Sequence, residues 1–352
     1  YRRNSDLQIQ YGLRVDGNQY EGIPVRNTKL EETFGVRNDY VPNKVYLSPR
    51  VGFSWTYGTA QQIGGFEGAV RGPRAVVRGG IGVFQNTPQT QLVGNAIDNT
   101  GLPSAVQQVT CMGPAAPLPN WDAYSTSLAN IPSACVDGSA GTVFANSAPN
   151  VTLFSKDYAA QRALRSVLSW SGSILNNTFQ ATFQGTYSRN MNQTGAGVDL
   201  NFSPVRRFAL ASEAGRPVYV QPTSIVPTSG AIASRDARVT SLYNRVSEMR
   251  SDLTSESQQL QASFSPVTFN TSWSWNLAYV YSNYREQYRG FSSTAGNPLD
   301  VTWGRSSMDA HHQVTYTVGY NFFDAVRVSW NGRVQSGSPF TPTIAGDVNG
   351  DG

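Results

Sequence analysis

The chain has 352 residues, of which only 14% are charged, and it contains 33 Gly, 17 Tyr, 16 Phe and 7 Trp. Soluble proteins are typically about 25% charged, and the low charge with many aromatic residues excludes a highly charged disordered chain. No run of about 18 apolar residues is present, which excludes a transmembrane helix, and the net charge of +4 comes from scattered arginines rather than the clustered basic face of a nucleic-acid-binding protein.

Apolar and polar residues alternate with a period of two along nine segments of about 10–15 residues. In chain order these segments are residues 7–16, 45–57, 74–84, 162–174, 177–189, 252–264, 267–281, 312–322 and 326–334. The alternation predicts strands with one apolar and one polar face. They are longer than the usual strand of about 5–6 residues, and they match a tilted strand that crosses a hydrocarbon layer, which needs about 9–11.

The predicted connections fall into two sets that alternate along the chain. Residues 17–44, 85–161, 190–251 and 284–311 form the long set, and residues 58–73, 175–177, 265–267 and 323–325 form the short set. Every long connection therefore lies at the same end of an antiparallel sheet. This asymmetry is typical of a bacterial outer-membrane barrel, with short periplasmic turns and long extracellular loops. The alternative is a secreted soluble β-sandwich whose aromatic residues pack across strands.

Most strand arginines lie on the polar side of the alternation. An Arg that faces lipid at the middle of the membrane would cost about 2–4 kcal/mol, so a membrane barrel must turn them inward. Arg162 and Arg189 break the rule, but both lie at strand ends next to long loops. The candidate lumen contacts are Arg14, Arg50, Arg78, Gln180, Gln184, Arg327 and Arg333. The alternative is that these side chains only hydrate the lumen.

Two features interrupt the strand pattern. Gly79, Gly80 and Gly82 suit either close approach of a segment packed inside the lumen or simple curvature of the barrel wall. Pro49 lacks a backbone donor, so we expect a bulge or the start of a strand there.

The only two cysteines, Cys111 and Cys135, lie in a connection rich in Pro, Ala and Ser. Their spacing fits no metal-binding pattern. A disulfide between them would stabilise the fold by roughly 3–4 kcal/mol and would indicate an oxidising compartment. The alternative is a pair of unpaired thiols in a loop.

Asp347, Asn349 and Asp351 match the first half of a calcium-binding loop, with oxygen ligands at alternate positions and Gly352 after them. The alternative is an ordinary turn rich in Asp, Asn and Gly. His311 and His312 point to opposite faces if they lie in a strand, so the pair cannot hold one metal ion together. No nucleophile elbow, Walker motif or dinucleotide fingerprint is visible, so we expect a protein that is not an enzyme and has no cofactor beyond a possible structural calcium.

Three strand phrases follow one another in order: residues 11–16 (YGLRVD), 47–53 (LSPRVGF) and 77–84 (VRGGIGVF). They resemble the barrel of TonB-dependent outer-membrane receptors. Residues 195–202 (GAGVDLNF) and 333–342 (RVQSGSPFTP) look like the Oar-like branch, whose members carry a carboxypeptidase-regulatory-like domain ahead of plug and barrel. The resemblance implies a 22-stranded barrel in outer-membrane lipid, a plug of its own and a TonB-type energising protein in the periplasm.

Nine strands are an odd number, which does not close a single-chain bacterial barrel. We therefore expect residues 1–352 to be part of one transmembrane antiparallel β-barrel domain, with the N-terminal plug and the closing C-terminal strands outside this chain. The favoured function is a receptor or transporter that binds an unknown extracellular substrate at its long loops and passes it through a plugged lumen. The alternative is a structural or adhesive outer-membrane surface protein without transport activity.

Overall fold

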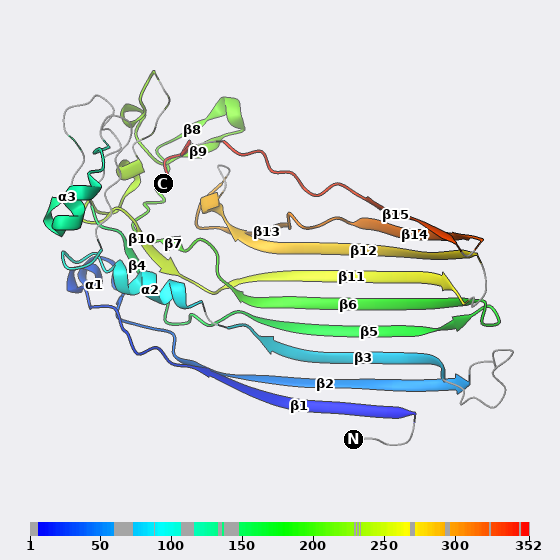
Figure 1. The fold of residues 1–352 in the computed structure, drawn as a ribbon. Coiled ribbons are helices and arrows are strands. Elements are labelled where there is room, and N and C mark those ends of the chain that lie inside the picture. The colour runs from blue at the N-terminus through cyan, green and yellow to red at the C-terminus, as the bar shows by residue number, and fades with distance from the viewer. Residues whose placement is uncertain are drawn as a thin grey trace.

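The computed structural model describes residues 6–59, 73–87, 89–106, 116–132, 136, 148–228, 230, 232, 234–267, 272–292, 296–323, 325–344 and 346–351. Its main feature is an antiparallel sheet in which nine strands pair in chain order, as Figure 1 shows. These strands are β1 (Leu7–Asn18), β2 (Lys44–Thr59), β3 (Pro73–Gln85), β5 (Arg162–Ile174), β6 (Phe179–Gln193), β11 (Leu253–Pro266), β12 (Trp273–Arg289), β14 (His312–Phe322) and β15 (Val326–Gln335). A tenth strand, β13 (Val301–Arg305), pairs only with β12. The predicted all-β antiparallel meander is confirmed.

The two ends of the sheet differ as the connection lengths predicted. Short links join β5 to β6, β11 to β12 and β14 to β15 at one end, and the long connections gather at the other (Figure 1). Leu175, Asn176 and Asn177 of the first turn all have positive φ, which lets the chain reverse within a few residues. Residues 60–72, between β2 and β3, lie outside the described residues.

One predicted turn is misplaced. The sequence pattern put a turn at residues 265–267 and a strand at 267–281, whereas β11 runs to Pro266 and β12 covers Trp273–Arg289. The loop end of β12 is longer than predicted because residues 285–289 pair with β13. The sequence pattern did not predict this extension, because it contains polar and charged residues such as Arg285 and Glu286 and shows no apolar alternation.

The long connections fold into a layered cap at one end of the sheet. It contains α1 (Thr28–Phe34), α2 (Thr90–Asp98), α3 (Trp121–Thr126), β4 (Val151–Phe154), β7 (Val198–Asp199), β8 (Phe208–Leu210), β9 (Arg216–Val218) and β10 (Val246–Met249). Strands β4, β10 and β7 form one small sheet, and β8 and β9 form another. Within the described residues, no helix combines the length and apolar character that a membrane span requires.

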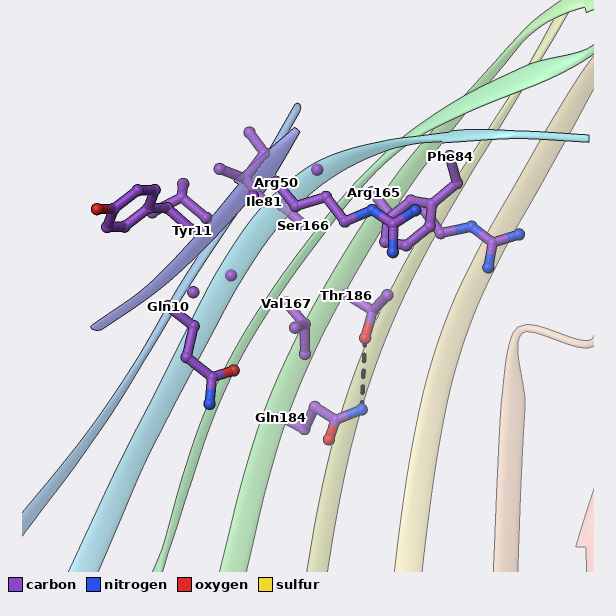
Figure 2. A pocket seen from close by; sticks show the side chains of 15 residues that line it. Gln10, Tyr11, Arg50, Ile81, Phe84, Arg165, Ser166, Val167, Gln184 and Thr186 are labelled. Atoms are coloured by element: carbon purple, nitrogen blue, oxygen red, sulfur yellow. Dashed lines mark hydrogen bonds between the residues drawn. The ribbon is translucent and has the colours of Figure 1, made fainter. Parts of the chain in front are cut away.

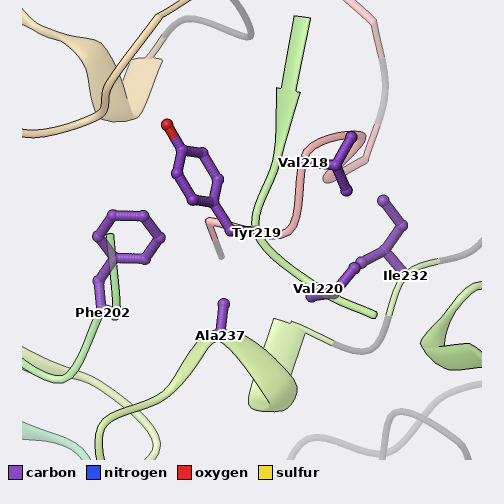
Figure 3. Close-up of a cluster of buried hydrophobic side chains, with 6 residues drawn as sticks. All are labelled: Phe202, Val218, Tyr219, Val220, Ile232 and Ala237. Carbon is purple, nitrogen blue, oxygen red and sulfur yellow. The ribbon is translucent and has the colours of Figure 1, made fainter. Parts of the chain in front are cut away.

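The buried apolar clusters of the described residues all lie in this cap rather than on the large sheet. Figure 3 shows one of them, in which Phe202 packs edge-to-face on Tyr219 at a ring-centroid distance of 5.0 Å. Asn201 connects the cap through its side chain, which donates to the Thr240 and Tyr243 carbonyls at 3.0 and 2.8 Å. The cap is therefore held by its own small cores and by buried hydrogen bonds.

The apolar face of the large sheet is left uncovered by the described residues. Tyr11 is 78% exposed and Leu168 is 58% exposed; about half of the apolar side chains on this side of the nine strands are exposed, and nearly all of the others are only partly buried. Cross-strand register keeps one parity of residues on this face from strand to strand, as in the pairs Val51–Ile81 and Ile81–Ser166. We call this apolar side the outer face and the polar side the inner wall.

Pro49 does not start a strand or form a bulge, which corrects the sequence expectation. It lies inside β2 opposite Leu13, and the pairing of β2 with β3 ends one residue away, at Arg50 and Gly82. Since proline has no N–H to donate, the ladder to β3 stops there. The Arg162 side chain then donates to the Leu47 carbonyl at 2.8 Å and satisfies a group that the ladder leaves open.

The three glycines of β3 have different roles. Gly79 lies on the outer face beneath Phe53, and a Cβ at this position would come within 2.4 Å of the Phe53 ring. It is required by cross-strand packing of an aromatic ring over bare backbone. Gly80 and Gly82 lie on the opposite side, on the inner wall.

Candidate binding site on the inner wall

The residues predicted to face the lumen all lie on the inner wall. Register places Arg14, Arg50 and Arg78 on the polar side of β1, β2 and β3, Gln180 and Gln184 on that of β6, and Arg327 and Arg333 on that of β15. They do not form one site. Arg14 donates to Asp16 at 2.7 Å at one edge of the sheet, whereas Arg333 donates to Gln313 at 2.8 Å at the opposite edge. That any of them contacts a substrate stays a prediction.

The most developed part of the wall is centred on β2, β3 and β5. Arg50 lies opposite Gly82, and Gly82 lies opposite Arg165, so two arginines flank one glycine in a single cross-strand row. The guanidinium carbons of Arg50 and Arg165 lie 4.9 and 5.7 Å from the centroid of the same ring, that of Phe84 (Figure 2). Both charged groups therefore lie against the same aromatic ring.

Glycine leaves the wall bare next to these arginines. Gly52 and Gly80 are opposite each other, and a Cβ on either would lie only 3.3 or 3.2 Å from a backbone oxygen of the neighbouring strand. A Cβ on Gly12, by contrast, would meet nothing within 4 Å. The result is a hollow of about 630 Å³, with Gln10, Gln184 and Thr186 among its lining residues.

The charge of this part of the wall is positive. Within the described ranges, Arg50, Arg78 and Arg165 form no ion pair. Asp16 is the only described carboxylate on the inner side of β1 to β3, and it forms an ion pair with Arg14. Amide and hydroxyl groups supply the remaining polarity, for example Gln184, which donates to Thr186 at 3.4 Å. The hollow therefore combines two fixed cations, an aromatic ring and exposed backbone.

Sequence reasoning missed two members of this site. Arg165 lies on the polar side of the alternation but is not one of the seven candidate lumen contacts, and Phe84 has no predicted role beyond the strand of residues 74–84. The available signal was Phe84 itself, which is a large aromatic residue on the polar parity of its strand. Its contact with Arg50 could not be read from the sequence, because alternation gives the face of each residue but not the register between β2 and β3.

On the outer face, the apolar surface ends in a slanted boundary toward the loop cap. On the seven strands from β3 to β15, the mainly apolar run of outer-face residues ends at Val83 on β3, Leu164 on β5 (beyond the single polar Ser166), Tyr187 on β6 (with one further apolar residue, Met191, beyond Arg189), Leu260 on β11, Tyr281 on β12, Val314 on β14 and Val334 on β15. There are six steps between neighbouring strands from β3 to β15. In three of these steps the boundary moves two residues toward the short turns, relative to the paired residue on the preceding strand. The slope is about one residue per strand.

This slope converts to a strand tilt. A rise of about 3.3 Å per residue against a strand spacing of about 4.8 Å gives an angle of about 35° between the strands and the normal to the boundary. Just past the boundary the outer face becomes charged, where Arg189 lies 3.8 Å from Glu256 and the Arg285 guanidinium lies 5.5 Å from the Trp303 ring centroid. Arg162, the second predicted exception, lies on the same side.

The predicted calcium residues lie in the cap. The Asp347 carboxylate accepts from the backbone N–H groups of Asn349 and Gly350 at 3.1 and 2.7 Å, and the Asn349 amide donates to Asp351 at 3.0 Å. Burial, with the nearby Asp347 charge, raises the pKa of Asp351 to about 6. Calcium binding at these oxygens stays a prediction. Cys111 and Cys135 lie outside the described residues.

His311 and His312 make separate contacts. His311 lies 2.8 Å from the Ser282 carbonyl and 3.4 Å from the buried carboxylate of Asp309, and His312 lies 2.9 Å from the Tyr279 hydroxyl. The Ser282 hydroxyl donates to the Ala310 carbonyl at 2.7 Å and is not directed at a histidine. Within the described residues, no group of three His, Cys, Asp or Glu side chains could hold a metal ion.

No family model and no curated protein matches the chain. Among solved structures it is similar to the FrpB iron transporter of Neisseria meningitidis, with 11% identity and a TM-score of 0.42 over 94% of this chain and 30% of that one. It is also similar to the outer membrane transporter YddB of Escherichia coli, with 9% identity and a TM-score of 0.39 over 82% and 29% of the two chains. For the siderophore receptor PirA of Pseudomonas aeruginosa the values are 11% identity and 0.28 over 82% and 42%. The chain thus spans less than half of these proteins, and such low scores assign it to no family.

Proposed function

We propose that the chain is part of the wall of an outer-membrane receptor or transporter. The long loops capture a substrate outside the cell, and the inner wall surrounds the path along which the substrate moves inward. In this proposal the edges of the sheet, β1 and β15, pair with further strands of the same barrel, because an open edge would leave unpaired backbone groups in lipid.

The observation that carries the proposal is the slanted boundary of the outer face. In a membrane barrel the hydrocarbon layer cuts all strands at one level, so on tilted strands the edge of the apolar band must shift in register from strand to strand. The observed slope corresponds to a tilt of about 35°, and membrane barrels have tilts of about 35–45°. A soluble sandwich has no lipid layer to set such a boundary.

The inner wall supports a path for a polar substrate. It carries arginines, amides and hydroxyls, as a water-filled or plugged lumen requires. The resemblance in residues 11–16, 47–53 and 77–84 adds a plug inside the barrel and a TonB-type protein that drives its movement from the periplasm. The substrate would first meet the folded cap, whose own cores hold the loops in place.

The second candidate is an adhesive surface protein without transport. It is favoured by apolar side chains exposed in the cap: Leu118 is 90%, Trp121 75% and Leu128 81% exposed. Single exposed apolar residues are common, but three within eleven residues offer several apolar side chains to a protein partner. This reading needs the same barrel as an anchor.

Two experiments on the full-length protein test the proposal. The barrel is expected in the outer-membrane fraction and to run faster on a cold detergent gel than after boiling, since a closed barrel resists unfolding in cold detergent. A single mobility and recovery in the soluble fraction would contradict the membrane assignment.

Transport is separated from adhesion by untargeted mass spectrometry of periplasmic extracts. We compare wild-type cells with a strain that lacks this protein and with a strain that lacks the energising protein. A compound depleted in both deletion strains is expected. If no compound depends on this protein while the protein still binds a surface partner, the adhesive candidate replaces transport.

A further inference from the structure

We infer that Arg50, Phe84 and Arg165 form a clamp for an oxyanion, a carboxylate or phosphate group, in the hollow of the inner wall. This inference rests on the proposed function, because it requires the hollow to face the interior of the barrel. The clamp is built on three adjacent strands, so its geometry is held by backbone pairing rather than by a loop.

The arrangement of charges is the first argument. Arg50 and Arg165 belong to one cross-strand row with Gly82 between them, and both guanidinium groups contact the Phe84 ring, at 4.9 and 5.7 Å from its centroid. Two like charges on one face of a sheet, two strands apart, repel each other. Aromatic contact holds the two cations in place, and it does not neutralise them.

The lack of a counter-charge is the second argument. In the described part of the chain no carboxylate pairs with either guanidinium. Arg14 shows the contrast on the same wall, since its own strand supplies Asp16 at 2.7 Å. An anion from outside the wall would bridge Arg50 and Arg165 and remove their repulsion.

The shape of the hollow is the third argument. Gly52 and Gly80 leave the wall without side chains beside the clamp, so a ligand can approach the backbone there, and the Arg50 side chain passes over Gly82. Arginine presents a planar fork of N–H donors that matches a carboxylate or phosphate with two parallel hydrogen bonds. Gln184 and Thr186 line the same hollow and supply further polar groups for the rest of the ligand (Figure 2).

The oxyanion has two possible sources. It belongs either to a substrate on its way through the barrel or to an acidic side chain of a segment of the same protein that fills the lumen. Both present the same chemistry to the clamp, and they differ in whether the clamp is free to bind an added anion.

The test uses the full-length protein in detergent micelles and the variants Arg50→Gln and Arg165→Gln. The matched control is Arg74→Gln, which removes an arginine of β3 that does not line the hollow. In the first arm, citrate and inorganic phosphate are titrated by calorimetry. Loss of one charge-assisted contact is expected to weaken binding about 10- to 100-fold in either clamp variant, with Arg74→Gln unchanged within about twofold. Arg50→Lys keeps the positive charge but lacks the planar fork of N–H donors, so its affinity for the anion is expected to lie between that of the wild type and that of Arg50→Gln.

The second arm detects an internal occupant. If an acidic segment of the protein fills the clamp, the wild type binds neither probe, and the double variant Arg50→Gln/Arg165→Gln makes that segment sensitive to protease, whereas Arg74→Gln does not. The inference is overturned if the clamp variants behave like Arg74→Gln in both arms. Cold-gel mobility of each variant reports the barrel separately, so failure of the clamp and failure of the membrane assignment are distinguishable.

Discussion

The substitution of Leu168 by Arg separates a lipid-facing from a water-facing outer surface. Leu168 and Val167 are adjacent in β5 and point to opposite faces, with exposed fractions of 58% and 40%. In a soluble sheet both side chains would meet water, and an arginine at either position would change stability by about 0.5 kcal/mol or less. In the proposed barrel only residue 168 meets lipid.

The magnitude follows from the position of Leu168 in the apolar band. On β5 the outer-face run extends from Leu164 to Ile174, so Leu168 lies near its middle. Arginine near the bilayer midplane costs about 2–4 kcal/mol, and in the lumen it costs little. We therefore expect Leu168→Arg to be less stable than Leu168→Ala by about 2–4 kcal/mol, and Val167→Arg to match Val167→Ala within about 1 kcal/mol.

The assay is guanidinium unfolding of the full-length protein refolded into phospholipid vesicles, followed by tryptophan fluorescence. Comparison with the alanine variants removes the effect of lost packing from both positions. Equal costs of arginine at residues 167 and 168 would refute the assignment of the two faces.

Three further substitutions test separate parts of the fold. Gly79→Ala places a Cβ 2.4 Å from the Phe53 ring and should lower the free energy of unfolding by about 1–3 kcal/mol in the same titration. The control Gly12→Ala, whose Cβ meets open space, should cost less than about 1 kcal/mol. Equal effects would contradict the packing of Phe53 over Gly79. Asn201→Ala leaves buried carbonyls unpaired and should destabilise the cap by about 1–3 kcal/mol, seen as faster limited proteolysis, and unchanged cleavage would contradict the role of its hydrogen bonds. The folded-state pKa of Asp351 is raised from 3.8 to about 6, so its contribution favours folding below about pH 4 and is lost as pH rises through about 6. The Tyr219 amide donates to the Asn349 carbonyl, so its hydrogen exchange reports on this loop. In calcium-free buffer, and after correction for intrinsic rates, the amide should be less protected at pH 7 than at pH 5, and Asp351→Asn should remove the difference. A pH dependence that persists in the variant would exclude Asp351 as its cause.

The large sheet could be predicted from the sequence because its signal is local. Period-two alternation places Leu13 on one face and Arg14 on the other without knowledge of any partner strand. The same locality explains the failures. Arg285 and Glu286 continue β12 without apolar alternation, and Pro49 lies within β2 because only its pairing toward β3 is lost.

The cap and the clamp could not be predicted, because their contacts join distant parts of the chain. Asn27 donates to the Thr100 carbonyl across 73 residues, and Tyr243 donates to Asn27 across 216. The clamp requires the register of three strands before Arg50 and Arg165 can be seen to share Phe84. Sequence alternation gives the face of each residue but not its neighbour on the next strand.

The slanted boundary of the outer face is the central claim, and one pair of positions tests it directly. Tyr11 on β1 and Asn283 on β12 belong to a single continuous row of paired residues across the sheet, yet they fall on opposite sides of the boundary. Nitroxide labels at each position in the full-length protein in vesicles report access to oxygen, which concentrates in lipid, and to a water-soluble nickel chelate. The label at residue 11 should be reached mainly by oxygen and the label at residue 283 mainly by the chelate. Equal accessibility at the two positions would contradict a tilted sheet spanning a membrane.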